Sequence, residues 1–169
     1  MTIYHVCEQH HDSVASEVRR KEAARTSWQS LYSQGVKPLY LKACQRTSAE
    51  VGDRRNLPFL KDVLSLGVDA AQQANDIVMF TNDDVFLHPS LPALLKGHLD
   101  KHACCSSQRC EFVNIQIPWG MKPEEYAQLG QRHMGRDLFA FTTSWLEKHW
   151  NQIPEYLLGC SDWDLGMAM

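Results

Sequence analysis

Apolar and polar positions alternate along the first half of the chain in blocks that predict strands and helices in turn. Residues 2–7, 38–43 and 77–81 are short apolar or β-branched runs of strand length. Between them, apolar residues recur at helical spacing over 14–34 and over a segment from Pro58 to about Ala74. This order of elements predicts an α/β fold with a mostly parallel sheet.

The second half of the chain predicts shorter elements. They are a helix at 91–102 capped by Ser90, strands at 111–117 and 138–142, a short helix opened by Pro123, and a helix whose first turn is the capping box Ser144-Trp145-Leu146-Glu147. Residues 103–110 show no such periodicity, and we expect a loop there.

Local signals mark the ends of the two long helices. Gly35, followed by Pro38, should stop the first helix, because glycine accepts the left-handed backbone at a helix end. Asn56 is the expected N-cap of the second helix, with Pro58 in its first turn. No repeat or linker divides the chain, so we expect one domain over residues 1–169.

Composition narrows the classes of function. The chain has 169 residues and a formal net charge of -3, which gives no basic surface for a nucleic acid. No apolar run is long enough to span a bilayer, and the N-terminus lacks the features of a signal peptide. We therefore expect a soluble, cytoplasmic protein whose six cysteines are free thiols.

An acidic pair, Asp83-Asp84, follows the apolar run 77–81. Ligands of open α/β sheets bind beyond the carboxyl ends of the strands. Two adjacent carboxylates there repel each other unless a positive charge joins them, and oxygen ligands suit Mg²⁺ or Mn²⁺. Such an ion would bridge the oxygens of a bound diphosphate. The alternative is an ordinary acidic turn ahead of the helix at Ser90.

The segment from Asp76 to Pro89 resembles the metal-binding strand of the GT-A glycosyltransferases, in particular the family-2-like group. The Asp-x-Asp motif of that family corresponds here to Asn82-Asp83-Asp84, with asparagine at the first position. The resemblance implies that Asp84 binds the metal and that Asp83 holds the ribose or the metal. It also implies a GT-A-like, Rossmann-related three-layer sandwich.

Two further segments are similar to the same family. Arg55, followed by an asparagine and a helix, resembles its Arg-Asn segment, which implies that Asp53, Arg54 and Arg55 lie near the nucleotide. These residues could equally be an exposed charge cluster. Gly135 begins a segment similar to the glycine-led strand near the acceptor, where it could allow close approach of the donor or simply form a turn.

The end of the chain, Gly159 to Leu165, resembles the acidic segment that carries the catalytic base of inverting GT-A enzymes. The resemblance implies that Asp162 takes a proton from the acceptor hydroxyl, with Asp164 as second candidate. Trp163 could stack on a sugar or pack against the protein. A helix-capping role for Asp162 stays open.

Together these segments predict a metal-dependent glycosyltransferase that moves a sugar from a UDP- or GDP-sugar to a hydroxyl acceptor, with inversion. One alternative is a nucleotide-sugar-binding module or degenerate paralogue without turnover. Another is a nucleotidyltransferase, although the segment after the first strand, 8–13, contains no glycine for a phosphate loop.

A different metal site is conceivable in the middle of the chain. The candidate zinc ligands are His98, His102, Cys104, Cys105 and Cys110. The two histidines are four residues apart and share a helix face. The spacing lacks a Cys-x-x-Cys knuckle, so we prefer incidental thiols to a zinc site.

Overall fold

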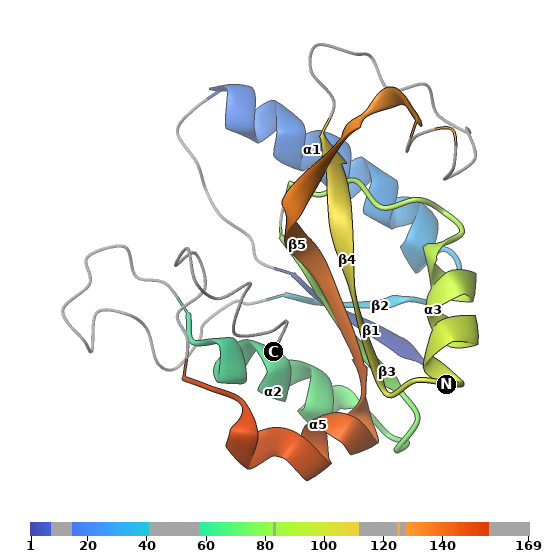
Figure 1. The fold of residues 1–169 in the computed structure, drawn as a ribbon, viewed down its shortest axis with the longest axis vertical. Coiled ribbons are helices and arrows are strands. Elements are labelled where there is room, and N and C mark those ends of the chain that lie inside the picture. Colours follow the sequence, from blue (N-terminus) through green and yellow to red (C-terminus); the bar gives the residue numbers. More distant parts are fainter. Residues whose placement is uncertain (8–14, 41–57, 83, 112–124, 126–127, 156–169) are drawn as a thin grey trace, which may run out of the picture.

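The computed structural model describes residues 1–7, 15–40, 58–82, 84–111, 125 and 128–155. Within these residues, five strands form one sheet, and four α-helices pack on its two faces (Figure 1). The strands are β1 (Ile3–Cys7), β2 (Lys37–Tyr40), β3 (Ile77–Thr81), β4 (Cys104–Glu111) and β5 (Gln131–Thr142). The helices are α1 (Ala15–Tyr32), α2 (Leu60–Ala70), α3 (Leu91–Leu99) and α5 (Thr143–His149), and a 3-10 turn, η2 (Trp150–Gln152), follows the last.

The sheet is mixed, with strand order β2-β1-β3-β5-β4. β1 pairs in parallel with β2 and β3, whereas β5 runs antiparallel to both β3 and β4. The α/β class is therefore confirmed, but the expected mostly parallel sheet is not, because two of the four described strand pairings are parallel and two are antiparallel. Residues 138–142 of β5 are buried on both faces of the sheet. A strand buried in this way is apolar whether it runs parallel or antiparallel to its neighbour, so its sequence does not indicate its direction.

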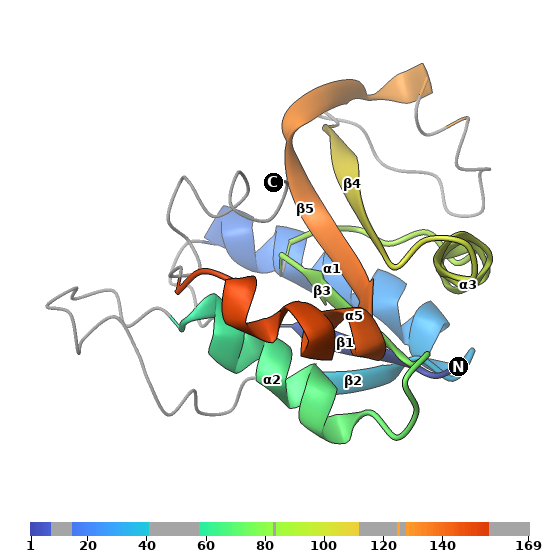
Figure 2. The same cartoon turned by 60° about the horizontal axis from the view of Figure 1, so that its bottom comes forward.

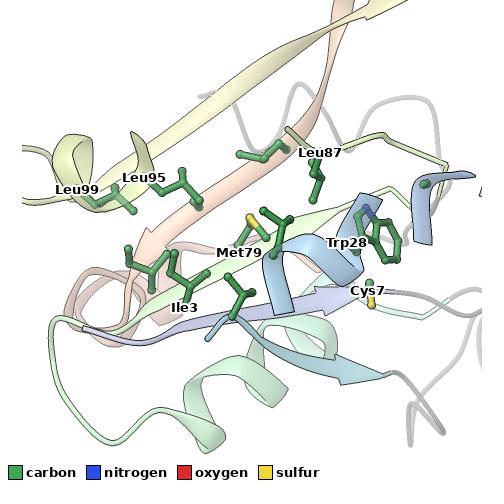
Figure 3. Close-up of a cluster of buried hydrophobic side chains, with 13 residues drawn as sticks. Ile3, Cys7, Trp28, Met79, Leu87, Leu95 and Leu99 are labelled. Atoms are coloured by element: carbon green, nitrogen blue, oxygen red, sulfur yellow. The ribbon is translucent and has the colours of Figure 1, made fainter. Parts of the chain in front are cut away.

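Alternate residues of the central strands face two separate cores. On one face, side chains of β1, β3 and β5 pack against α1 and α3 (Figure 3). The main contributors there are Ile3, Met79, Trp28, Leu31, Leu95 and Leu99. On the other face, α2 and α5 lie side by side (Figure 2) and cover Val6, Val78, Phe80, Phe139 and Phe141. Burial on both faces explains why β3 is uncharged at every position.

The first helix ends at Tyr32, two residues before the predicted end at residue 34, and Gly35 forms the turn that stops it, as predicted. Gly35 has a φ of 88°, and its N–H bonds to the carbonyl of Tyr32. A residue with a side chain would be strained in this backbone conformation. The turn at Gly35 then directs the chain into β2, beside β1.

The second helix is shorter than predicted at both ends. It begins at Leu60 with Phe59 as N-cap, so the start expected at Pro58 is wrong, while Asn56 lies outside the described residues. It ends at Ala70, because the backbone N–H groups of Gln72 and Gln73 donate to the Asp76 carboxylate, each at 3.1 Å. Burial alone would raise the pKa of Asp76, but backbone N–H donors lower it below its ordinary value.

One predicted helix cap is right in position only, and another is wrong. Ser90 is the N-cap residue of α3, as predicted, but its side chain makes no capping bond; its hydroxyl lies 2.7 Å from His88 Nδ1, and α3 ends at Leu99 rather than at residue 102. The N-cap of α5 is Thr142 instead of Ser144, and its hydroxyl accepts a hydrogen bond from the Trp145 N–H. Thr142 is still paired with β3, so the helix starts as soon as the strand ends.

The region 103–110, predicted as a loop, is mostly strand β4. Among the described strands, β4 pairs with β5 alone and forms an edge of the sheet, so much of it is solvent-exposed and it needs no apolar alternation. β5 is correspondingly longer than predicted and starts at Gln131. The strand predicted at 111–117, apart from Glu111, and the helix start at Pro123 lie outside the described residues.

No helix in the described part of the chain is long and apolar enough to cross a membrane.

Candidate functional site

The predicted metal-binding turn lies at the carboxyl end of the parallel half of the sheet. β3 ends at Thr81, and Asn82 and Asp84 follow it, both half-buried; Asp83 lies outside the described residues. β2 and β3 pair on opposite sides of β1, so the chain reverses its direction of winding between β1 and β3. Open α/β sheets bind ligands at such a switch point, outside the carboxyl ends of the strands.

Asn82 is fixed in place by Asp137 of the antiparallel neighbour β5. The Asn82 backbone N–H donates to the Asp137 carbonyl at 3.2 Å, and the Asn82 amide Nδ2 donates to Asp137 Oδ1. Asp137 is buried, with 3% of its surface exposed. Because Nδ2 is engaged, the amide oxygen of Asn82 is directed away from the Asp137 carboxylate.

Asp137 also binds a guanidinium group from the edge strand. Arg109 Nη1 lies 2.9 Å from both carboxylate oxygens of Asp137, while Arg109 Nη2 donates to Glu111 Oε1 at 2.7 Å. Burial would lower the pKa of Arg109, but its two acidic partners raise it above its ordinary value. The hydrogen bond from Arg109 lowers the pKa of Glu111. The charge of Asp137 is thus matched by an arginine that stays protonated.

A β-bulge gives Asp137 this position. The β4–β5 register passes from Ser107 paired with Leu138 to Gln108 paired with Arg136, so Asp137 is the extra residue on β5. Bulges redirect side chains and are common beside functional sites. The bulge allows one carboxylate to contact both Asn82 on β3 and Arg109 on β4.

The segment after the acidic turn is held by helix α1. Trp28 Nε1 donates to the Val85 carbonyl at 2.9 Å, and the Leu87 N–H donates to the hydroxyl of Ser27 at 3.0 Å. Trp28 and Ser27 are almost fully buried, and Figure 3 shows Trp28 and Leu87 in the same core. The turn is therefore anchored on both sides, by Asp137 before it and by α1 after it.

Beneath this edge of the sheet lies a buried polar cluster around His5. Its Nε2 is 2.8 Å from Thr81 Oγ1, its Nδ1 is 3.2 Å from the Tyr32 hydroxyl, and its ring meets Trp28 edge-on. Burial lowers the pKa of His5 to about 3 and raises that of Tyr32. Both groups are therefore neutral at physiological pH, and they join β1 and β3 to α1.

No model of a known protein family and no curated protein matches the chain.

Three of the ten residues expected at the site lie in the described part of the chain. Asn82 and Asp84 share the turn after β3, whereas Gly135 lies in β5, where its N–H donates to His133 Nδ1 at 2.9 Å. The residues expected at the site that lie outside the described part are Asp53, Arg54, Arg55, Asp83, Asp162, Trp163 and Asp164.

Sequence reasoning did not single out Asp137 and Arg109. The available signal was the position of Asp137, a charged residue directly before the apolar run 138–142, because a carboxylate at the end of a buried strand needs a partner. Arg109 gave no such signal, since it falls in a polar segment that lacks periodicity.

The alternative zinc ligands do not form a cluster. His98 and His102 stack on each other, with ring centroids 4.5 Å apart, while Cys104 and Cys110 lie near opposite ends of β4. Among the described residues, no three histidine, cysteine or acidic side chains come together as a metal site. The four described cysteines are free thiols.

Proposed function

We propose that this chain is the nucleotide-sugar-binding domain of a metal-dependent glycosyltransferase with a GT-A-like fold. The observation that carries the proposal is the position of the Asn82–Asp84 turn at the switch point between β1 and β3. The parallel order β2-β1-β3, the antiparallel strand beside it and the helices on both faces support the fold. The resemblance of this turn to the metal-binding motif supports the chemistry.

The described side chains of the turn suit a hard divalent cation. Asp84 is a half-buried carboxylate, and the Asn82 amide directs its oxygen away from Asp137. Carboxylate and amide oxygens are the ligands that Mg²⁺ and Mn²⁺ take. Asp84, with Asp83 beside it, would hold the ion, which when bound would neutralise charge on the leaving diphosphate. Asp137 is matched by Arg109 and would position the turn without binding the ion.

The remaining roles rest on the resemblance. Asp162 would accept the proton of the acceptor hydroxyl as it attacks the sugar, and Asp164 is the second candidate for this base. The residues proposed to bind substrate are Asp53, Arg54, Arg55, Asn82, Asp83, Gly135 and Trp163. The donor would be a UDP- or GDP-sugar.

The proposal is tested by the thermal stability of the protein with a panel of UDP-, GDP- and dTDP-sugars, each with and without Mn²⁺. A ligand at about 100 times its Kd stabilises the native state by about 2.7 kcal/mol. For a chain of this size, that corresponds to a rise in Tm of about 5–10 °C. We expect such a rise with one class of nucleotide sugar, and only when Mn²⁺ is present.

The matched variants are Asp84→Asn and Asp69→Asn. Each removes one carboxylate charge, but Asp69 is exposed on α2 and distant in the fold from the acidic turn. Asp84→Asn should abolish the Mn²⁺-dependent rise, and Asp69→Asn should retain it. An equal rise in both variants would remove Asp84 from the metal site. Donor binding without any sugar transfer would favour a binding module over an enzyme.

A further inference from the structure

A cavity of about 420 Å³ lies on the part of the two-stranded β4–β5 ribbon that extends beyond the end of β3. β3 pairs with residues 138–142 only, so the first half of β5 contacts β4 without support from the rest of the sheet. Figures 1 and 2 show this two-stranded ribbon bending away from the sheet. Two register shifts between the strands account for the bend, because bulges increase the local twist.

Three arginines line the cavity, and only one of them has an acidic partner among the described residues. Arg109 is paired with Asp137 and Glu111. Arg136 is half-buried, and its Nη1 donates to the hydroxyl of Ser106 at 2.6 Å; Arg132 is exposed. Neither Arg132 nor Arg136 forms an ion pair within the described part of the chain. The cavity therefore holds two guanidinium charges that no described carboxylate balances.

We propose that this cavity binds the phosphate group of a small molecule. A phosphate monoester carries close to two negative charges at neutral pH and offers three oxygens, which matches two guanidinium forks. Ser106, Ser107 and Gln108 also line the cavity, and the Ser106 hydroxyl, which accepts from Arg136, can donate to a further oxygen. The volume lies in the range of small-molecule sites.

The cavity is connected to the acidic turn through Arg109. Arg109 lines the cavity and binds Asp137, which in turn holds Asn82. A phosphate in the cavity would therefore lie near the turn but outside it. Resting on the proposed function, this position assigns the phosphate to the acceptor, so the enzyme would glycosylate a phosphorylated hydroxyl compound.

The experiment is a titration with inorganic phosphate at constant ionic strength, without nucleotide or Mn²⁺, followed through the NMR signals of the arginine Nε–H groups. We expect saturable shifts for Arg132 and Arg136. The double variant R132Q/R136Q should bind phosphate at least about tenfold more weakly, since a hydrogen bond to a charged group is worth at least that factor. A double variant K96Q/K148Q, which removes two exposed charges on α3 and α5, should bind like the wild type.

The proposal is overturned if inorganic phosphate causes no saturable shift, or if R132Q/R136Q and K96Q/K148Q bind it equally. Acetate should bind more weakly than phosphate. If acetate binds equally well, the ligand of the cavity would be a carboxylate and not a phosphate. R132Q alone changes an exposed residue and should weaken binding while the fold is retained, which keeps the test valid if the double variant unfolds.

A second titration tests the acceptor assignment. Phosphate is added again in the presence of Mn²⁺ and the nucleoside diphosphate selected by the thermal-shift panel. Unchanged phosphate affinity supports an acceptor site separate from the donor. Displacement by the nucleotide would assign the cavity to the donor. If no nucleotide binds, the proposed function and the acceptor assignment fail, while the phosphate site stands on the first titration.

Discussion

The buried imidazole of His5 makes the stability of the fold depend on pH in a way that can be measured. His5 is fully buried, and its two ring nitrogens contact the hydroxyls of Thr81 and Tyr32. Burial penalises the charged form and lowers the pKa of His5 from 6.5 to about 3. In the unfolded chain the imidazole regains its ordinary pKa.

The sign of the effect follows from proton uptake. Below pH 6.5 the unfolded state binds a proton at His5, whereas the folded state does so only near pH 3. Stability is therefore lost as the pH falls from about 6.5 towards about 3, in contrast to a histidine that gains an acidic partner on folding. At about pH 5 the loss from this one residue amounts to about 2 kcal/mol.

The assay is urea unfolding followed by tryptophan fluorescence, for the wild type and His5→Gln, at about pH 7.5 and about pH 5. Glutamine retains polar contacts but does not titrate. All other titrating groups are shared, so their contributions cancel in the difference. The wild type should lose about 2 kcal/mol more than His5→Gln between the two pH values. Equal losses in the two proteins would refute a neutral buried His5.

Three further substitutions test helix packing and the ion pair beside the acidic turn. Gly67→Ala on α2 should destabilise the protein by about 1–3 kcal/mol, because the added methyl group would overlap the buried side chain of Val78. Gly97→Ala on α3 meets open space and should stabilise the fold by about 0.5–1 kcal/mol, so opposite signs in urea unfolding are the expected outcome. Asp137→Asn should cost about 1–3 kcal/mol, less than for a fully buried pair, because Arg109 is one-third exposed and can be solvated. An unchanged unfolding midpoint would show that the ion pair adds no stability.

The central layers of this fold could be predicted from sequence because each element had a strong local signal. The run 77–81 coincides with β3, and Gly35 ends the first helix. The errors arose where distant contacts decide the outcome. Asp76 ends α2 early by binding backbone N–H groups, and pairing with β3 keeps Thr142 in a strand up to the start of α5.

The candidate site was predictable in part for the same reason. The acidic turn follows an unmistakable buried strand, so its location at the sheet edge was expected. The partners of this turn were not expected, because Asp137 meets Asn82 only when β5 pairs antiparallel with β3, and Arg109 meets Asp137 only through the register between β4 and β5. A contact between residues 55 positions apart leaves no periodic trace in either segment.

The antiparallel strand β5 is what allows one carboxylate to connect two chemically different places. A parallel strand beside β3 would end where β3 ends. β5 runs antiparallel, so its first half lies beyond the end of β3, in the ribbon with β4, and its second half pairs with β3. Asp137 lies where these two parts of β5 meet, and its carboxylate contacts both the Asn82 amide and the Arg109 guanidinium. Since Arg109 matches its charge, Asp137 adds rigidity to the acidic turn without adding negative charge to it. The proposed binding of a cation by the turn would then depend on Asp83 and Asp84. The proposed binding of an anion by the ribbon would depend on Arg132 and Arg136.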